Sequence, residues 1–208
     1  MLEYKKLEPN DEDIVTEYYE TYLNGGPSVR GYIRKGLADE GFVGYKCVDA
    51  EAGKFVGMIA ARPGIEFTCA HPELVEMVKE RWGTEGVYTG DMMVVDPAYR
   101  KHGVGRQLAV LLRQGLRERR AVCMVMELWL RHQEGDVPAL HPLQNAWKDF
   151  NIVTLTVVKD FYKNLSDYGL TCPECGSDCK CGALIAALVL DDPAEGEGDR
   201  EKEKTQEA

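Results

Sequence analysis

The sequence predicts a mixed α/β fold, in which helices flank a central sheet that contains both parallel and antiparallel strands. Two apolar segments, residues 41–49 and 54–62, surround the polar turn 50–53 and predict an antiparallel hairpin. Further along, an apolar run that ends at Val95, an amphipathic helix and the apolar run 121–130 predict a strand–helix–strand crossover, whose two strands run parallel. The 208 residues, 44% of them hydrophobic, suffice for the core of one domain over residues 1–190.

The remaining elements follow from local patterns. Before the hairpin, the sequence predicts a strand at residues 2–7 and helices over 11–23 and 28–37. An insertion is expected at 63–86, with a helix that ends at Trp82, and a second insertion at 131–152 with a short helix near 143–150. Three segments close the chain: a last helix over 154–167, a final strand over 183–190, and a tail, 191–208, too polar to be ordered.

Charge and composition exclude some classes of function. The net charge is −10, and the last 18 residues, with eight acids and three bases, carry half of it. A mildly acidic body argues against general nucleic-acid binding. The sequence contains no apolar run long enough to span a membrane, and its first residues lack a signal-peptide core, so we expect a cytoplasmic protein without membrane contact.

The segment from Gly90 to Arg120 has the features of an anion site. An apolar strand ends at Asp96-Pro97, the turn contains Gly103 and Gly105, and an amphipathic helix follows at once. The first N–H groups of a helix have no partner within it and attract negative charge. Because glycines let the backbone approach a ligand closely, the turn predicts a phosphate-bearing ligand at residues 100–106.

The motif in this turn distinguishes among nucleotide folds. A P-loop would need Gly-Lys-Ser/Thr, and a dinucleotide fingerprint a third small residue where Leu108 stands. The sequence VVDPAY followed by Arg-x-x-Gly-x-Gly instead resembles the GNAT superfamily of acyl-CoA-dependent N-acyltransferases. The order of the elements before the turn is also similar to that family.

The resemblance implies a fold and a donor site. Two parallel strands should splay apart at their C-terminal ends and admit the pantetheine arm of acetyl-CoA, while the turn binds its diphosphate. It also implies two closing strands, of which the sequence offers one, so the C-terminal edge of the sheet is expected to be shortened. The residues carried over to the donor site are Met93, Val94, Val95, Arg100, Lys101, His102, Gly103, Val104, Gly105 and Arg106.

The resemblance further implies direct acetyl transfer to an amine, with catalytic groups that this sequence only partly matches. Tyr162 is the first candidate for the acid that protonates the departing thiolate, and Tyr168 the second. Some relatives carry a glutamate base at the position of Thr89, which cannot act as one. Asp91 is therefore the candidate base, with Glu127 and His141 as alternatives.

Four of the seven cysteines, Cys172, Cys175, Cys179 and Cys181, lie within ten residues of one another. The run Cys-Pro-x-Cys-Gly resembles a zinc knuckle, and four thiolates suit a tetrahedral structural zinc site. A reduced cysteine-rich loop and an iron–sulfur cluster are the alternatives.

Two functions thus compete at this level. The first is an N-acetyltransferase for a small-molecule or protein amine, active as a monomer or homodimer. The second is a non-catalytic CoA-binding sensor or interaction module, favoured by the absence of a clear base and by the zinc knuckle.

Overall fold

The computed structural model describes residues 1–131 and 146–190. Seven strands of these residues form one sheet, in the order β1-β2-β3-β4-β5-β7-β6, and every neighbouring pair is antiparallel except β4 and β5. The strands are β1 (Leu2–Lys6), β2 (Val43–Asp49), β3 (Lys54–Pro63), β4 (Val87–Val95), β5 (Cys123–Leu130), β6 (Ile152–Val158) and β7 (Gly182–Val189). The predicted mixed α/β class, with one parallel pair, is confirmed.

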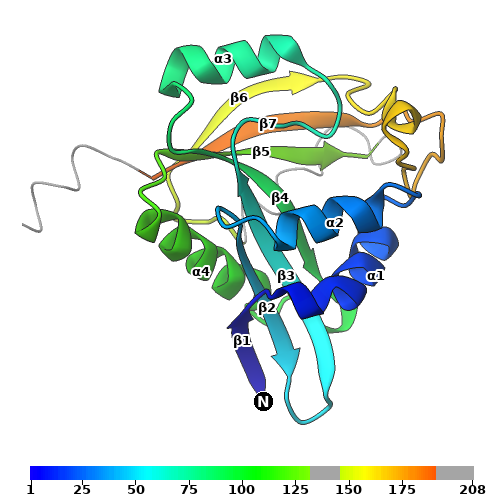
Figure 1. Ribbon diagram of the computed structural model, residues 1–208, viewed down its shortest axis with the longest axis vertical. Helices are drawn as coiled ribbons and strands as arrows, with labels where there is room; N and C mark the ends of the chain where they lie inside the picture. Colours follow the sequence, from blue (N-terminus) through cyan, green and yellow to red (C-terminus); the bar gives the residue numbers. More distant parts are fainter. Residues whose placement is uncertain (132–145, 191–208) are drawn as a thin grey trace, which may run out of the picture.

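Four α-helices of the described residues cover the two faces of the sheet: α1 (Glu12–Tyr22), α2 (Val29–Leu37), α3 (Pro72–Trp82) and α4 (Val104–Glu118). Leu108, Leu112 and Leu116 of α4 are fully buried against residues of β2, β3 and β5. Buried residues of α1 and α2 form a second cluster, and those of α3 belong to a third. The strand residues in these two clusters alternate along the strands with those that pack against α4, so they lie on the opposite face of the sheet. Helix α4 therefore covers one face, and α1, α2 and α3 cover the other (Figure 1).

The largest error of the sequence analysis concerns residues 154–167, which do not form a helix. Residues Ile152–Val158 are strand β6, which pairs antiparallel with β7, and Leu165–Tyr168 are one short 3₁₀ segment. The spacing of Val158, Phe161 and Leu165 is typical of a helix, but β-branched residues dominate 152–158 and prefer a pleated surface.

Strand β6 also corrects the expectation of a shortened C-terminal edge, because it lies beside β7 as a second closing strand. The expected short helix near 143–150 is not present in its described part, since residues 146–150 form turns. The start of that segment and the tail 191–208 lie outside the described residues. Within the described ranges, no helix combines the length and apolar character needed to cross a membrane.

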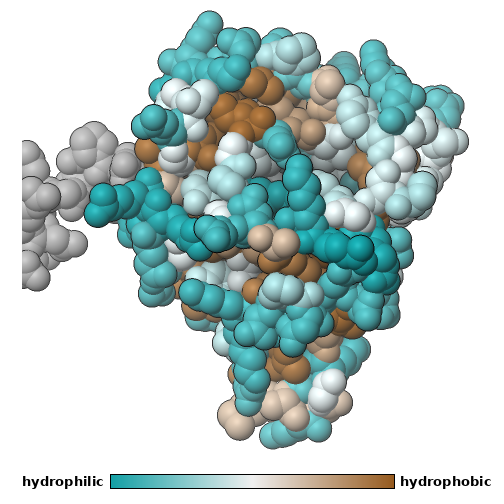
Figure 2. Space-filling model, viewed as in Figure 1, coloured by the Kyte–Doolittle hydropathy of each residue, from teal (hydrophilic) through white to brown (hydrophobic). Residues whose placement is uncertain are grey.

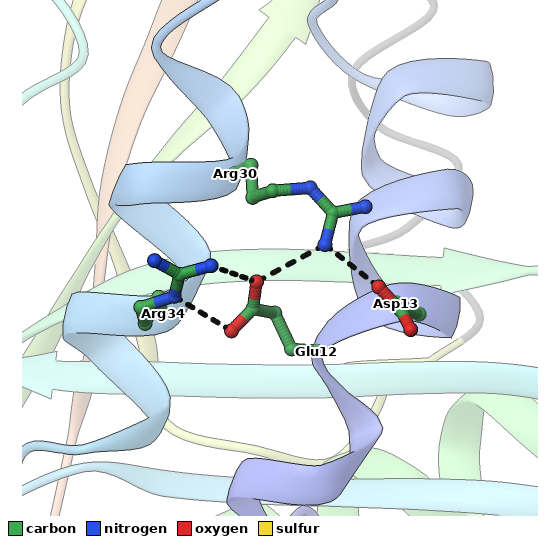
Figure 3. A network of polar contacts seen from close by, with 4 residues as sticks. All are labelled: Glu12, Asp13, Arg30 and Arg34. Atoms are coloured by element: carbon green, nitrogen blue, oxygen red, sulfur yellow. Dashed lines mark hydrogen bonds and ion pairs between the residues drawn. The ribbon is translucent and has the colours of Figure 1, made fainter.

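Helices α1 and α2 are joined by an ion-pair network (Figure 3). Arg30 bonds to Glu12 at 3.1 Å and to Asp13 at 2.7 Å, and Arg34 bonds to Glu12 at 2.8 Å. Arg34 and then Arg30 lower the pKa of Glu12 to about 2. Such exposed pairs add little stability, but they restrict how the two helices lie against each other.

On the face shown in Figure 2, hydrophilic residues prevail over α2, and hydrophobic ones show beneath α3.

Candidate active site

The site begins where β4 and β5 separate. Their parallel pairing covers only Val87–Thr89 of β4 and Cys123–Val125 of β5, although β4 continues to Val95 and β5 to Leu130. Beyond Thr89, the described part of β4 pairs with β3 alone. The β4 edge that faces β5 therefore opens into a cleft of about 1250 Å³, which residues 90–95 line.

A β-bulge at Asp91 determines which side chains face this cleft from β4. In the pairing with β3, Gly90 lies opposite Ala61 and Met92 opposite Ala60, so Asp91 is an extra residue. Successive strand residues point to opposite faces, and one extra residue reverses the alternation after it. As a result, Met92 and Val94 pack with α1 and α2, while Met93 and Val95 pack on the α4 side.

The outer end of the cleft is the turn before α4. Gly103 precedes the helix in a left-handed conformation, with φ 81°, which favours glycine. The N–H of Gln107 donates to Gly103 O at 3.0 Å, so the N–H groups before it form the open end of the helix. A Cβ at Gly105 would lie 3.1 Å from Met93 Cε, and a larger side chain there would crowd the cleft. This backbone can approach an anion closely.

Basic side chains surround the turn. Arg100 donates from Nε to Val95 O at 2.9 Å, which fixes its guanidinium against the end of β4. Arg106 donates to Lys148 O at 2.6 Å and pairs with Asp149 at 3.1 Å. Arg100, Lys101 and Arg106 all line the cleft, so its outer end carries positive charge.

Glu127 of β5 lies at the inner end of the cleft. Its carboxylate accepts hydrogen bonds from the backbone N–H of Thr68, at 3.0 Å, and from the Thr68 hydroxyl. Burial raises the pKa of Glu127 to about 7, although the bonds from Thr68 act in the opposite direction. A carboxyl group with this pKa can exchange a proton near neutral pH.

Tyr162 lines the same inner end, from the connection between β6 and β7. Its side chain is buried, and its backbone N–H donates to Cys181 O at 3.3 Å. Burial, and then the neighbouring Glu127 carboxylate, raise the pKa of Tyr162 well above its ordinary value. The phenol therefore keeps its proton at neutral pH and can donate it.

Asp91 also lines the cleft, but its carboxylate is held by other side chains. One oxygen bonds to Arg62 Nε at 2.8 Å, and the other accepts a hydrogen bond from the Tyr32 hydroxyl. The ion pair is almost fully buried, with side-chain exposures of 11% for Arg62 and 1% for Asp91. The guanidinium also lies over the Tyr32 ring, 3.6 Å from its centroid. This pairing suits a structural role for Asp91 better than proton transfer.

A second cavity of about 260 Å³ adjoins the inner end of the cleft. Both spaces are lined by Tyr19, Thr68, Gly90, Asp91 and Glu127. Aromatic side chains from α1, α2, the 63–86 segment and the 3₁₀ segment surround the second cavity, together with Arg62 and the acids Glu66, Asp91 and Glu127. Glu127 can therefore contact molecules in either space.

The four clustered cysteines come together close to this region. The Sγ atoms of Cys172, Cys175, Cys179 and Cys181 all lie within 4.8 Å of one another, and those of Cys175 and Cys181 are 3.6 Å apart. Tetrahedral zinc with Zn–S bonds of about 2.3 Å separates its sulfurs by about 3.8 Å. All four cysteines are free thiols, and Cys172 lines the large cleft.

Comparison with known proteins identifies the family. The profile of the acetyltransferase (GNAT) family matches residues 11–141, which is more than half of the sequence. The chain belongs to the GNAT family of acetyltransferases. The match ends before β6, β7 and the four clustered cysteines. No curated protein sequence matches this GNAT chain.

Solved structures agree on the fold. The ribosomal-protein-S18-alanine N-acetyltransferase from Escherichia coli is 14% identical, with a TM-score of 0.60 over 92% of this GNAT chain and 96% of that one. Arabidopsis thaliana NAA60 in complex with acetyl-CoA is 10% identical, with a TM-score of 0.60 over 92% and 100%. An aminoglycoside 6'-N-acetyltransferase complexed with coenzyme A is 13% identical, with a TM-score of 0.59 over 91% and 98%.

Most residues expected at the donor site of this GNAT chain lie together. Every one of them lines the large cleft except His102. Tyr162, Asp91 and Glu127 also line it, whereas the second candidate acid, Tyr168, borders only the smaller cavity and accepts a hydrogen bond from Ala70 N–H at 2.8 Å. The third candidate base, His141, lies outside the described residues.

Arg62, Tyr32 and Thr68 are site residues that were not predicted from the sequence. Arg62 had a detectable signal, since it is a cation at the end of the apolar run FVGMIAA. Tyr32 and Thr68 lie far along the chain from their partners, and nothing local indicates their role.

Proposed function

We propose that this GNAT chain transfers the acetyl group of acetyl-CoA directly to an amine, and that residues 1–190 act as one catalytic unit. One observation carries the proposal: a cleft runs from the glycine turn along the open edge of β4 to Glu127 and Tyr162. Its volume of about 1250 Å³ exceeds the range typical of drug-sized ligands, about 300–1000 Å³, and so favours a long one.

The donor would lie along this cleft. Backbone N–H groups at 103–106, with Arg100, Lys101 and Arg106, would bind the diphosphate, and the β4 edge at Met93–Val95 would pair with the pantetheine amides. A backbone N–H near Val94 or Val95 would stabilise the oxyanion that forms on the thioester.

Glu127 is the base that the geometry favours, and Tyr162 the acid. The amine nitrogen attacks the thioester carbon, the C–N bond forms and the C–S bond breaks. Glu127 takes the proton that the amine loses, and Tyr162 gives its proton to the departing thiolate. Since Tyr162 and Glu127 are neighbours, the proton can then return from the carboxyl group to the phenolate. Buried Cys69 does not offer a nucleophile, because burial raises its pKa to about 12.

The acceptor would enter through the smaller cavity, where Glu66 and Glu127 would attract a cationic amine and Arg62 neutralises Asp91. The similar structures include a ribosomal-protein-S18-alanine N-acetyltransferase and an aminoglycoside 6'-N-acetyltransferase, that is, enzymes named for a protein and for a small molecule. Both kinds of amine therefore belong in the test.

We also propose that the four clustered cysteines hold one structural zinc ion. Four thiols within 4.8 Å of one another supply the ligand number and spacing that tetrahedral zinc requires. A reducing compartment would keep them as thiols.

Thiol release from acetyl-CoA with a panel of small amines and peptides tests the reaction. We expect turnover with at least one acceptor, and kcat/KM that rises with pH through about 7, because Glu127 must lose its proton before it can accept another. Glu127→Gln should lower kcat about 100-fold and remove this inflection. Acetyl-CoA binding without thiol release on any acceptor would instead indicate the sensor function.

A further inference from the structure

We infer that the four-cysteine site, loaded with zinc, positions Tyr162 at the inner end of the cleft. The inference rests on the proposed zinc site and on the proposed acetyl transfer. It predicts that loss of the metal impairs turnover but leaves acetyl-CoA binding intact.

Tyr162 and all four ligands lie in one connection, residues 159–181, between β6 and β7. Regular structure within it is limited to the short 3₁₀ segment Leu165–Tyr168. Long connections with so little secondary structure need another source of order to hold a side chain at a reaction site. A metal bound by four ligands within this connection provides such order.

The ligand residues contact Tyr162 directly through the backbone and through packing. Tyr162 N–H donates to the carbonyl of Cys181, so movement of this ligand moves the tyrosine backbone. Phe161, Tyr162 and Leu165 share a buried cluster with Cys172, Cys179 and Cys181, each of which is at most 6% exposed.

The same loop is attached to two other walls of the site. Thr171, next to Cys172, exchanges backbone hydrogen bonds of 2.9 and 2.7 Å with Gly25, which lies between α1 and α2. Glu174, next to Cys175, pairs with Arg131 after the end of β5, at 3.2 Å. A rigid cysteine loop therefore fixes Tyr162 relative to the helices and to the strand that carries Glu127.

The turn within the loop has the shape that metal binding needs. Cys172 and Gly176 exchange backbone hydrogen bonds of 3.2 and 2.9 Å, and Gly176 has φ 71°. Cys172 and Cys175 thus lie in one tight turn, and Cys179 and Cys181 come back to it. A bound ion would join the two halves of this loop through four metal–sulfur bonds.

The test combines zinc content, hydrogen exchange and steady-state kinetics on the full chain. Wild-type protein should contain one zinc per chain, and a chelator should remove it. Its removal should speed amide exchange in residues 160–166, where Tyr162 N–H bonds to Cys181, and leave exchange in β4 unchanged. Unchanged exchange at 160–166 after zinc loss would overturn the inference, as would loss of protection throughout the chain, which would make the metal a general stabiliser.

Variants separate positioning from simple destabilisation. Cys175→Ser should lose zinc and lower kcat about 10-fold to 100-fold, with the KM for acetyl-CoA changed less than about twofold. Cys175→His, which restores a zinc ligand, should recover both zinc and most of kcat. Cys123→Ala is the control, because Cys123 lies in the same cluster, is more deeply buried than Cys175 and is no ligand, and it should retain zinc and kcat.

The possible failures are distinguishable. A zinc-free wild type would refute the metal site and this inference together. Full kcat in zinc-free Cys175→Ser would refute the inference alone. If no acceptor is turned over, the exchange experiment still decides whether zinc orders the Tyr162 segment, while the acetyl-transfer proposal fails separately.

Discussion

The outer and inner ends of the cleft hold their charges in opposite ways. At the outer end, Arg100, Lys101 and Arg106 are exposed, and the anion site consists mainly of backbone. At the inner end, Asp91 is buried against Arg62, and Glu127 is held by two hydrogen bonds from Thr68. An exposed site binds a charged ligand from water at little cost, whereas buried groups acquire shifted pKa values that suit chemistry.

This difference leads to separate consequences of mutation. Changes at the outer end should alter donor affinity and little else. Changes at the inner end should alter stability or turnover, because its buried charges depend on one another.

The largest expected effect is on stability, from Asp91→Ala. It leaves the Arg62 guanidinium buried without its carboxylate, which should lower the free energy of unfolding by about 3–5 kcal/mol. The matched change at the outer end, Asp149→Ala, breaks the exposed pair with Arg106 and should cost about 0–1 kcal/mol. Urea unfolding measures both, and equal losses would contradict the proposed contrast between the two ends.

Next is the donor turn, where Gly103→Glu places a negative charge and a strained side chain at the expected diphosphate site. We expect the KM for acetyl-CoA to rise about 100-fold, with a smaller change in kcat. Gly53→Glu is the control, since Gly53 also has positive φ and open space around it but lies in the β2–β3 turn. Normal acetyl-CoA binding by Gly103→Glu would refute the donor-site assignment.

A smaller effect is expected from Tyr162→Phe, which removes the proton donor and keeps the ring. Turnover should fall about 10-fold to 100-fold, while the KM for acetyl-CoA changes less than about twofold. Tyr168→Phe, at the border of the smaller cavity, should retain turnover. Steady-state kinetics at saturating acceptor distinguish the two, and unchanged turnover in Tyr162→Phe would exclude it as the acid.

The smallest expected effect is a dependence of stability on pH, which Glu127 causes at the inner end of the cleft. The folded pKa of Glu127, about 7, lies above the ordinary value of about 4.3, so the folded state holds this proton more tightly than the unfolded state. Stability should therefore fall as pH rises from about 4 to 7, and Glu127→Gln should escape this loss. We expect the variant to be about 1–3 kcal/mol more stable than wild type at pH 8, and nearly equal to it at pH 4. Equal stability of the variant and the wild type at pH 8 would show that folding does not raise the pKa of Glu127.

Local patterns were enough to predict the outer end of the cleft. Gly103, Gly105 and the apolar positions of α4 are close in the sequence, so spacing alone indicates a strand, a turn and a helix. The inner end combines residues far apart in the chain, such as Thr68 with Glu127, or Tyr32 and Arg62 with Asp91. No short-range pattern indicates these pairs.

The error at residues 154–167 has a related cause. The apolar positions fit a helix as well as a strand, and β7, nearly thirty residues later in the chain, decides between them by offering an edge to pair with. Tyr162 was selected from a supposed helix end, yet it lines the cleft from a turn. Its place depends on contacts with the cysteine loop, which a helix-based argument did not include.

The extra residue at Asp91 has a consequence for how this gene can vary. Because Asp91 is the extra residue, loss of its codon would leave Gly90 opposite Ala61 and Met92 opposite Ala60, and the side chains beyond it would keep their faces of the sheet. A one-codon insertion after Met92 has no such extra residue to absorb it, and would turn the rest of the strand to the opposite faces. The β2–β3 turn at residues 50–53, by contrast, can change length without any such reversal. Length scanning should therefore find that an insertion after Met92 misplaces residues 93–95, whereas deletion of Asp91 costs mainly its pairing with Arg62.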